Sequence, residues 1–325
     1  MSETSPTKKM FEETICEWMV VIDEFLSGAA IPISQRIFMA ADIFMKNAIV
    51  EVKGYDKEEY LSSKWFKDIL RPIREWYHQK YGAALEAGAD DLHAVVELFG
   101  DYFLISIPLS IRHDNNDNTY WIEFPSEVQS QERPQEWIHR PPNFEVLDTD
   151  EQRRTAEAVC EVCSAVRNIR CSILNSEQPD DAARELARLV VAHLSSSAIA
   201  ISNSRRSPLG LACWNAHQAV EKALKLIIRQ EGNGYPHTHN LLDLARAAGG
   251  RVEESDYEIL ERFPTNKQII EMRTGEGGVV AAGQAYGLYR NAVEILNLWA
   301  SKLPRRYGVQ SGRYLLRKLP WQIEE

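Results

Sequence analysis

The sequence predicts a mixed fold: an N-terminal α+β domain, made of helices plus a three-stranded antiparallel meander, followed by an all-α helical bundle. Apolar residues recur every three or four positions through most of the chain, which is typical of amphipathic helices. Between residues 93 and 124 they form short, dense runs separated by turn residues, which is typical of strands. From Thr155 onward only the helical spacing is present, so strands are expected in the first domain alone.

Three helices are predicted before Gly82. The first carries one apolar stripe, which ends before Gly28 and consists of Phe11, Ile15, Trp18, Ile22 and Phe25. Ser34 can cap the second helix, and Asp56 with Glu59 has the capping-box spacing that begins the third. Pro72 should kink or restart the third helix because proline has no backbone N–H to donate.

The strands of the meander are predicted from turn residues. The dense apolar run from His93 to Ile111 is interrupted by Gly100-Asp101, which suits a two-residue hairpin turn with glycine in first position. The segment 114–118, Asp-Asn-Asn-Asp-Asn, marks a second turn and is followed by a third strand over residues 119–124. Four prolines after this strand predict an irregular connection over residues 125–150.

Composition limits the classes of function. The 325 residues are 44% hydrophobic and 26% charged, which fits two ordinary soluble domains. The formal net charge of -10 argues against a surface that attracts nucleic acid as a whole, so any such site must be local. No run approaches the roughly 18 apolar residues of a spanning helix. Five scattered cysteines fit a reducing compartment, and we expect a cytoplasmic protein with no membrane partner.

The C-terminal helices follow one another with short connections. A connecting helix is expected over residues 151–179, and a second helix begins at about Asp180. Two long helices span about Pro208 to Gln230 and Val279 to Leu303, with three shorter helices between them. The apolar stripe of the first long helix consists largely of alanine, which implies close helix packing in a bundle.

Two short motifs in this bundle resemble the HEPN family of helical domains. The long helix carries Gln218-Ala-Val-Glu221-Lys222-Ala-Leu-Lys225, and after a Gly/Pro loop the next helix begins Thr238-His-Asn-Leu-Leu-Asp-Leu. The resemblance covers residues 180–303 and implies a four- or five-helix bundle, often dimeric. Members are metal-independent RNases of toxin–antitoxin and phage-defence systems or non-catalytic modules that bind nucleotides or partner proteins. Residues 1–150 resemble no family that we can name.

The catalytic members carry an arginine followed four to six positions later by histidine, near the start of the last long helix. The corresponding segment of this chain, Arg273 to Val279, has no histidine. A literal match, Arg188 with His193, lies on the first helix of the bundle among apolar residues. These two residues are the candidate catalytic pair, and the alternative is a partly buried histidine that only packs in the core. The departure from the family pattern favours a domain without RNase activity.

Candidate ligand-binding residues lie on the motif helix and in two loops. The polar face of this helix is either a solvated, salt-bridged surface or a groove that offers cations to a phosphate, and Glu221 with Lys225 forms a favourable i,i+4 pair. His237 and His239 precede a helix, and Arg273 precedes the glycine-rich segment 275–278. The candidates are Gln218, Lys222, Lys225, Arg229, His237, His239 and Arg273.

No metal or cofactor is predicted. Cys160 and Cys163 form a lone C-x-x-C without further ligands at zinc spacing, so core packing is favoured. The segment 304–325 is a basic and aromatic tail in which Arg305, Arg306, Arg313, Arg317 and Lys318 alternate with Tyr307, Tyr314 and Trp321. Such a tail could bind single-stranded RNA or pack on the acidic N-terminal domain.

The expected organisation is therefore an α+β domain of unknown role over 1–150, a connecting helix over 151–179, a HEPN-like bundle over 180–303 and a tail over 304–325. We expect a homodimer whose bundle binds a nucleotide, RNA or a partner protein without catalysis. The alternatives are a metal-independent HEPN endoribonuclease and a dimerising scaffold without a ligand.

Overall fold

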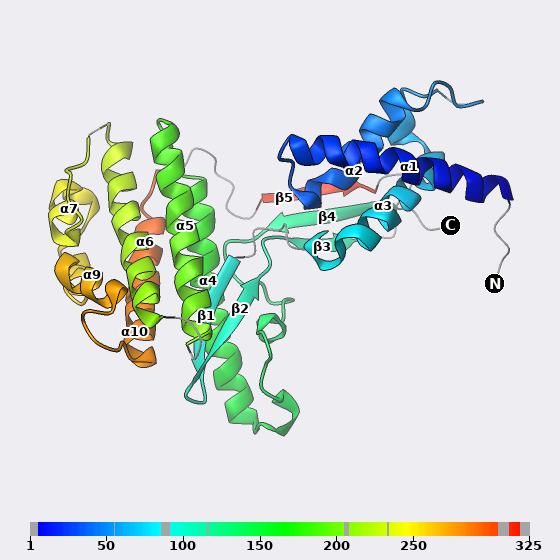
Figure 1. Ribbon diagram of the computed structural model, residues 1–325. Helices are drawn as coiled ribbons and strands as arrows, with labels where there is room; N and C mark the ends of the chain where they lie inside the picture. The colour runs from blue at the N-terminus through cyan, green and yellow to red at the C-terminus, as the bar shows by residue number, and fades with distance from the viewer. Residues whose placement is uncertain are drawn as a thin grey trace. The chain divides into compact units, whose positions relative to one another are not determined.

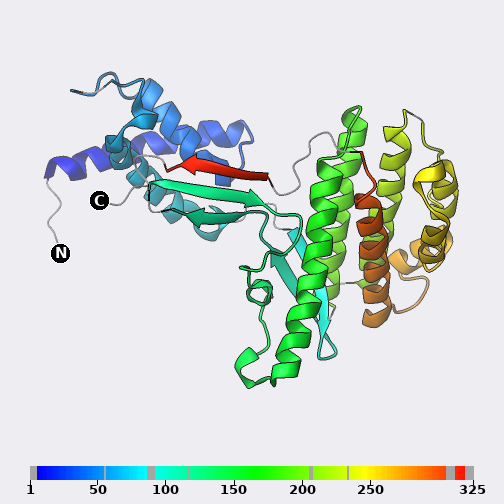
Figure 2. The same ribbon diagram turned by 180° about the vertical axis from the view of Figure 1, so that it is seen from behind.

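A computed structural model describes residues 6–54, 56–85, 92–115, 117–204, 208–232, 234–304 and 312–318. The chain forms two compact units (Figures 1 and 2). The first consists of Met1–Asp90, His113–Trp121 and Leu315–Glu325, and the second of Asp91–Arg112 and Ile122–Tyr314. This division differs from the expected boundary at residue 150, because the first strands of the presumed meander belong to the core of the second unit.

The first unit contains helices α1 (Pro6–Gly28), α2 (Ile33–Asn47) and α3 (Lys67–Tyr81). The helix expected to begin at Asp56 is wrong over its first part. Asp56 accepts a hydrogen bond from the amide of Glu58, two short 3₁₀ turns follow, and α3 begins only at Lys67. Helix α3 is assigned continuously through Pro72.

Helix α1 is present, but its apolar residues form two faces and not one stripe. Ile15, Met19, Ile22 and Leu26 are buried in the core of the unit. Phe11, Trp18 and Phe25, which the sequence grouped with Ile15 and Ile22, are exposed. Residues three and four apart are neighbours on a helix, so spacing alone did not separate a buried face from the face beside it.

Strands β1 (Leu92–Leu98) and β2 (Asp101–Ile107) form an antiparallel hairpin in which Leu98 pairs with Asp101. The turn is Phe99-Gly100 and not Gly100-Asp101, and both turn residues have positive φ, 55° and 77°. Positive φ at both positions is the pattern of a type I′ turn, which matches the twist of the paired strands. Strand β1 packs against α4 and α5, whose bounds are given below, so the hairpin is part of the second unit.

The expected three-stranded meander is wrong. Strands β3 (Ile111–Asp114), β4 (Thr119–Phe124) and β5 (Gly312–Arg317) form a separate sheet in the order β3-β4-β5. The part of the apolar run after the hairpin turn was expected to continue as one strand to Ile111, but β2 ends at Ile107, where Pro108 cannot donate to a strand ladder. The third strand comes from the segment expected to be a tail, and the tail residues Arg305, Arg306, Tyr307 and Trp321 lie outside the described residues.

The second unit is built on seven helices among the described residues: α4 (Thr149–Leu174), α5 (Asp181–Ser202), α6 (Leu209–Gln230), α7 (Leu241–Ala247), α8 (Glu254–Leu260), α9 (Asn266–Thr274) and α10 (Ala282–Ala300). The two long helices expected at 208–230 and 279–303 are confirmed as α6 and α10, with ends that differ by a few residues. Helix α4 packs against α10 and β1, so it is part of the bundle core and not only a connection.

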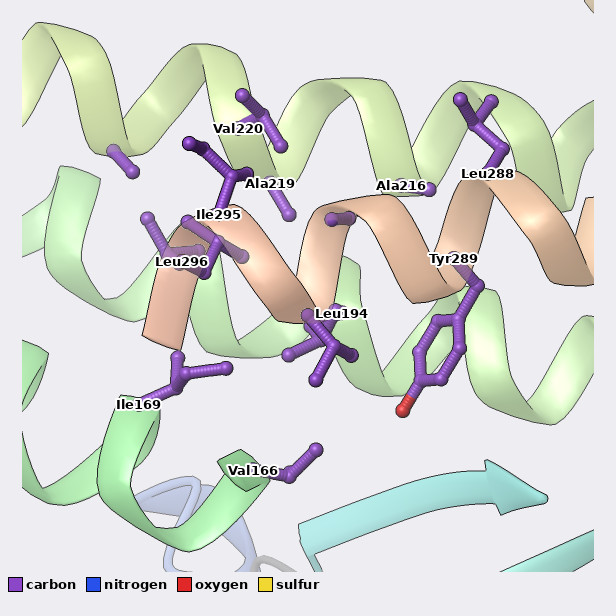
Figure 3. Close-up of a cluster of buried hydrophobic side chains, with 14 of the residues drawn as sticks. Val166, Ile169, Leu194, Ala216, Ala219, Val220, Leu288, Tyr289, Ile295 and Leu296 are labelled. Atoms are coloured by element: carbon purple, nitrogen blue, oxygen red, sulfur yellow. The ribbon is translucent and has the colours of Figure 1, made fainter. Parts of the chain in front are cut away.

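The bundle core lies between α4, α5, α6 and α10, whose apolar side chains point toward one another (Figure 3). Ala216 and Ala219 of α6 face this core, and their small side chains allow α5 and α10 to approach α6 closely. Among the described helices, α5 alone is long and apolar enough to cross a membrane. Its buried residues, which include Leu194, belong to this core, and that position accounts for its apolar character.

Candidate functional site

The polar residues of the motif helix α6 lie in a largely buried ionic cluster, which we call the Glu221 cluster. It consists of Gln218, Glu221, Lys222, Lys225 and His239. The Glu221 side chain is fully buried, whereas 9% of the Lys225 side chain and 17% of the Lys222 side chain are exposed. The interpretation of these residues as a solvated helix face is therefore wrong.

Glu221 is the centre of the cluster. Lys225 and Lys222 donate to its Oε1 atom over 2.7 and 3.1 Å, and Gln218 Nε2 donates to Oε2 over 2.9 Å. His239, from the loop before α7, contributes Nδ1 at 3.1 Å from both carboxylate oxygens. The expected i,i+4 pair of Glu221 with Lys225 is confirmed, and the carboxylate also ties this loop to α6.

The charges of the cluster do not cancel. Burial of the Glu221 carboxyl would by itself raise its pKa, but the bond from Lys225, the charge of Lys222 and the bond from His239 outweigh burial and lower the pKa to about 2. Glu221 is therefore ionised at neutral pH, and Lys222 and Lys225 leave one positive charge in excess. An uncompensated charge in a partly buried site is costly, so a neighbouring anion would stabilise it.

Two further histidines adjoin the cluster. His217 lies one helical turn before Glu221 and is 1% exposed, and its Nδ1 atom has no hydrogen-bond partner among the described residues. Burial lowers the pKa of His217 to about 4 against the attraction of Glu221. His193 of α5 donates from Nδ1 to Asn215 Oδ1 over 3.0 Å, and burial also lowers its pKa. Both rings are neutral near pH 7.

The remaining candidate residues lie elsewhere on the unit. Arg229 is paired with Asp180, the N-cap of α5, with Nη2 2.6 Å from Oδ2, so it joins the end of α6 to the start of α5. The Arg273 guanidinium lies 4.5 Å from the ring centroid of Trp214, near the opposite end of α6. His237 is exposed. The structure thus brings together Gln218, Lys222, Lys225 and His239, but not Arg229 or Arg273.

A comparison with protein-family models finds a match within the bundle. Residues 196–296 match the model of the HEPN domain family. The second unit contains a HEPN domain, at residues 196–296. The matched region begins within α5 and ends within α10, and it includes the whole Glu221 cluster. No curated protein and no solved structure matches the chain.

The candidate catalytic residues of this HEPN domain do not meet. Arg188 and His193 are five positions apart on α5, which places them about 140° apart around the helix. The Arg188 side chain is exposed, and His193 is half-buried and faces Asn215 of α6. Both residues precede the matched region, which begins at residue 196. The geometry therefore offers no arginine beside His193 on α5 to stabilise phosphorane charge.

A groove of the second unit is separate from the cluster. It has a volume of about 1030 Å³ and is lined by β1, α4 and α10. Its charged lining includes Glu97, Glu161 and Arg290, together with the pair of Arg262 and Glu294 at 3.7 Å. This groove contains none of the motif residues. We therefore base the candidate site on the connected, partly buried charges around Glu221.

Sequence analysis missed several members of the site. Asn215 holds His193, and the Tyr235 ring centroid lies 5.3 Å from Lys225 Nζ. His217 could have been found, because it precedes Glu221 by four positions and must lie on the same side of the helix. Its neighbour Phe263, with ring centroids 6.4 Å apart, comes from a distant segment that spacing does not reveal. The described residues contain no group of histidine, cysteine and acidic side chains that could hold a metal.

Proposed function

We propose that the HEPN domain binds the phosphate group of a nucleotide or of RNA at Lys222 and His239, and that it does not cleave the RNA. The observation that carries this proposal is the single excess positive charge of the Glu221 cluster. A phosphate beside Lys222 would neutralise this charge within a site from which water is partly excluded.

The exposure of the cluster residues separates an inner from an outer group. Gln218 and Lys225 are almost buried and hold the Glu221 carboxylate. The outer residues reach solvent, because 17% of the Lys222 side chain and 58% of the His239 side chain are exposed. An anion can therefore reach Lys222 Nζ from outside, next to the exposed His239 ring, while the inner residues keep Glu221 and its partners in position.

The local character of the site agrees with the charge of the whole chain. A chain with a net charge of -10 does not attract polyanions over its entire surface, so binding has to depend on a local excess of positive charge. No arginine of the described part of α5 lies beside His193, and this supports binding without cleavage, because general-base chemistry at a ribose needs the developing phosphorane charge stabilised as well.

Calorimetric titration of the full chain with mononucleotides and a short RNA tests the proposal. Lys222→Ala and His239→Ala should each weaken binding about tenfold or more, because the first removes the charge-assisted contact and the second removes a side chain that holds Glu221 and lines the site. Lys267→Ala is the matched control: this lysine is 85% exposed, lies on α9 and pairs only loosely with Glu271, at 3.7 Å. Its removal should change the affinity by less than about twofold.

Two results would overturn the proposal. Binding that Lys222→Ala and His239→Ala leave unchanged would place the ligand elsewhere, and no binding by the wild type would make partner docking the better account of this domain. Cleavage is tested separately by incubating the pure chain with total RNA in EDTA. We expect intact RNA, and degradation would establish a metal-independent RNase instead.

A further inference from the structure

Helix α1 of the first unit exposes an apolar stripe beside its buried face, and of this stripe Trp18 also contacts the core, edge-to-face with Phe44 at 6.2 Å between ring centroids. We call it the outer stripe, and its members are Phe11, Thr14, Trp18, Val21 and Phe25. The four apolar members are exposed by 39%, 38%, 63% and 67% in chain order. The buried face of the same helix already fixes α1 in the unit through Ile15 and its neighbours. An exposed row of large apolar side chains, three of them aromatic, is typical of an interaction surface.

The spacing of the outer stripe indicates which shape of partner it fits. Its members follow at intervals of three and four residues, an average of about 3.5, which is the repeat that keeps a seam facing a second helix. From Phe11 to Phe25 the stripe extends about 21 Å along the helix axis, or four turns. A straight apolar seam of this length fits an α-helix laid along it.

One border of the outer stripe is acidic. Glu13, Glu17 and Glu24 are exposed and fall on the same side of α1, next to Val21 and the other stripe residues. Between residues 9 and 28 the chain has a single cation, Lys9. Charges that flank an apolar seam select the partner, so this border favours a helix with lysine or arginine beside its own apolar residues.

We propose that α1 is the docking surface for an amphipathic helix of a partner protein, in which an apolar seam is flanked by basic residues. This site is independent of the nucleotide site proposed above, because it lies in the other unit. The acidic border disfavours three other occupants. An antiparallel pair of α1 helices would bring each glutamate row against its own copy. A membrane surface favours helices with a basic polar face. Nucleic acid is repelled by carboxylates.

The test uses two synthetic helical peptides of about three heptads, both with leucine at the seam positions. One carries lysine and the other carries glutamate at the flanking positions, and each is titrated into the full chain by fluorescence anisotropy. The lysine peptide should bind and the glutamate peptide should not. Exchanging Glu17 and Glu24 for lysine should reverse this preference.

Point variants locate the contact. Trp18→Ser and Phe25→Ser should each weaken binding of the lysine peptide by about tenfold or more, as expected for aromatic anchors in an interface. Val20→Ser is the matched control, because Val20 is 56% exposed on α1 but lies two positions from Trp18 and off the stripe. It should change the affinity by less than about twofold. All these side chains are exposed, and circular dichroism melts of each variant verify that the fold is kept.

Three results would overturn the proposal. The first is the absence of binding by either peptide. The second is an effect of Val20→Ser as large as that of Trp18→Ser. The third is a sedimentation experiment in which the chain alone is a dimer that Trp18→Ser converts to a monomer, because the outer stripe would then be covered by a second copy. Peptide binding that follows both the seam and the charge of the peptide supports it.

Discussion

Lowering the pH from about 7 to about 5 should destabilise the second unit by about 2 kcal/mol through His217 alone. The ring is 1% exposed, so a charge on it would be cut off from water, and its Nδ1 atom has no hydrogen-bond partner among the described residues. Three groups of the Glu221 cluster act on this ring. Glu221 attracts the proton, whereas His239 and Lys222 oppose it, and burial is the largest effect. The net result is a folded state that excludes the proton.

The sign of the effect follows from the two states. In the unfolded chain the imidazole has its ordinary pKa of 6.5, and in the folded chain burial lowers the pKa to about 4. Between these values the unfolded state binds a proton that the folded state does not, so stability falls as the pH falls. Each pH unit below 6.5 costs about 1.4 kcal/mol, and at pH 5 the sum is about 2 kcal/mol. Glu221 begins to lose its stabilising effect only below its ordinary pKa of 4.5.

The assay is urea unfolding of the full chain at both pH values, followed by circular dichroism, with His217→Leu beside the wild type. Leucine fills much of the volume, packs against Phe263 and removes an unpaired polar atom, so the variant should fold. The wild type should lose about 2 kcal/mol more than the variant on acidification. His237→Leu, in an exposed loop, is the control and should behave as the wild type. Equal pH dependence of the wild type and His217→Leu would refute the reasoning.

Two further outcomes follow from the packing and a third from the family resemblance. In urea unfolding, Gly210→Ala should destabilise the bundle by about 2 kcal/mol or more, because a Cβ there would lie 1.8 Å from the carbonyl oxygen of Met272. Gly287→Ala is the matched control. A Cβ at this position would have no other atom within 4 Å, so alanine should stabilise α10 by about 0.5 kcal/mol in the same assay. Asp23→Asn should cost about 3 kcal/mol in urea unfolding, because it leaves a buried ionic network without its anion. The family resemblance implies pairing through the last helices. Light scattering should therefore give a mass above 37.1 kDa, and Leu298→Glu, on the exposed side of α10, should reduce it to the monomer.

The long helices could be predicted because their information is local. The alanine stripe of α6 and its small residues required a close-packed helix, and the structure buries Ala216 and Ala219 in the bundle core. The position of the hairpin turn was predicted wrongly for a different reason. Phe99 adopts a positive φ, which is uncommon for a bulky residue and which the sequence therefore does not indicate. The sequence did not separate the outer stripe of α1 from its buried face, because apolar residues on two adjacent faces of a helix have the same spacing as one broad stripe.

The sequence predicted which residues of the candidate site lie together, but it did not predict that they are buried. The motif spacing placed Gln218, Glu221, Lys222 and Lys225 on one side of a helix, and they do meet. Charged residues are usually exposed, so the sequence favoured a solvated face. Burial of Glu221 depends on long-range packing, including the loop that brings His239 to it, and no local pattern encodes such contacts.

The geometry of the cluster also separates the residues that fold the HEPN domain from those available to a ligand. Lys222 and Lys225 both donate to Oε1 of Glu221, Gln218 donates to Oε2, and His239 Nδ1 lies 3.1 Å from both oxygens. If Lys222 turns toward a phosphate, Glu221 keeps Lys225, Gln218 and His239, and no buried charge is left alone. If Lys225 turns away, the deeper of the two cations is lost from a fully buried carboxylate. Lys222 can therefore exchange partners at small cost, whereas Lys225 belongs to the fold.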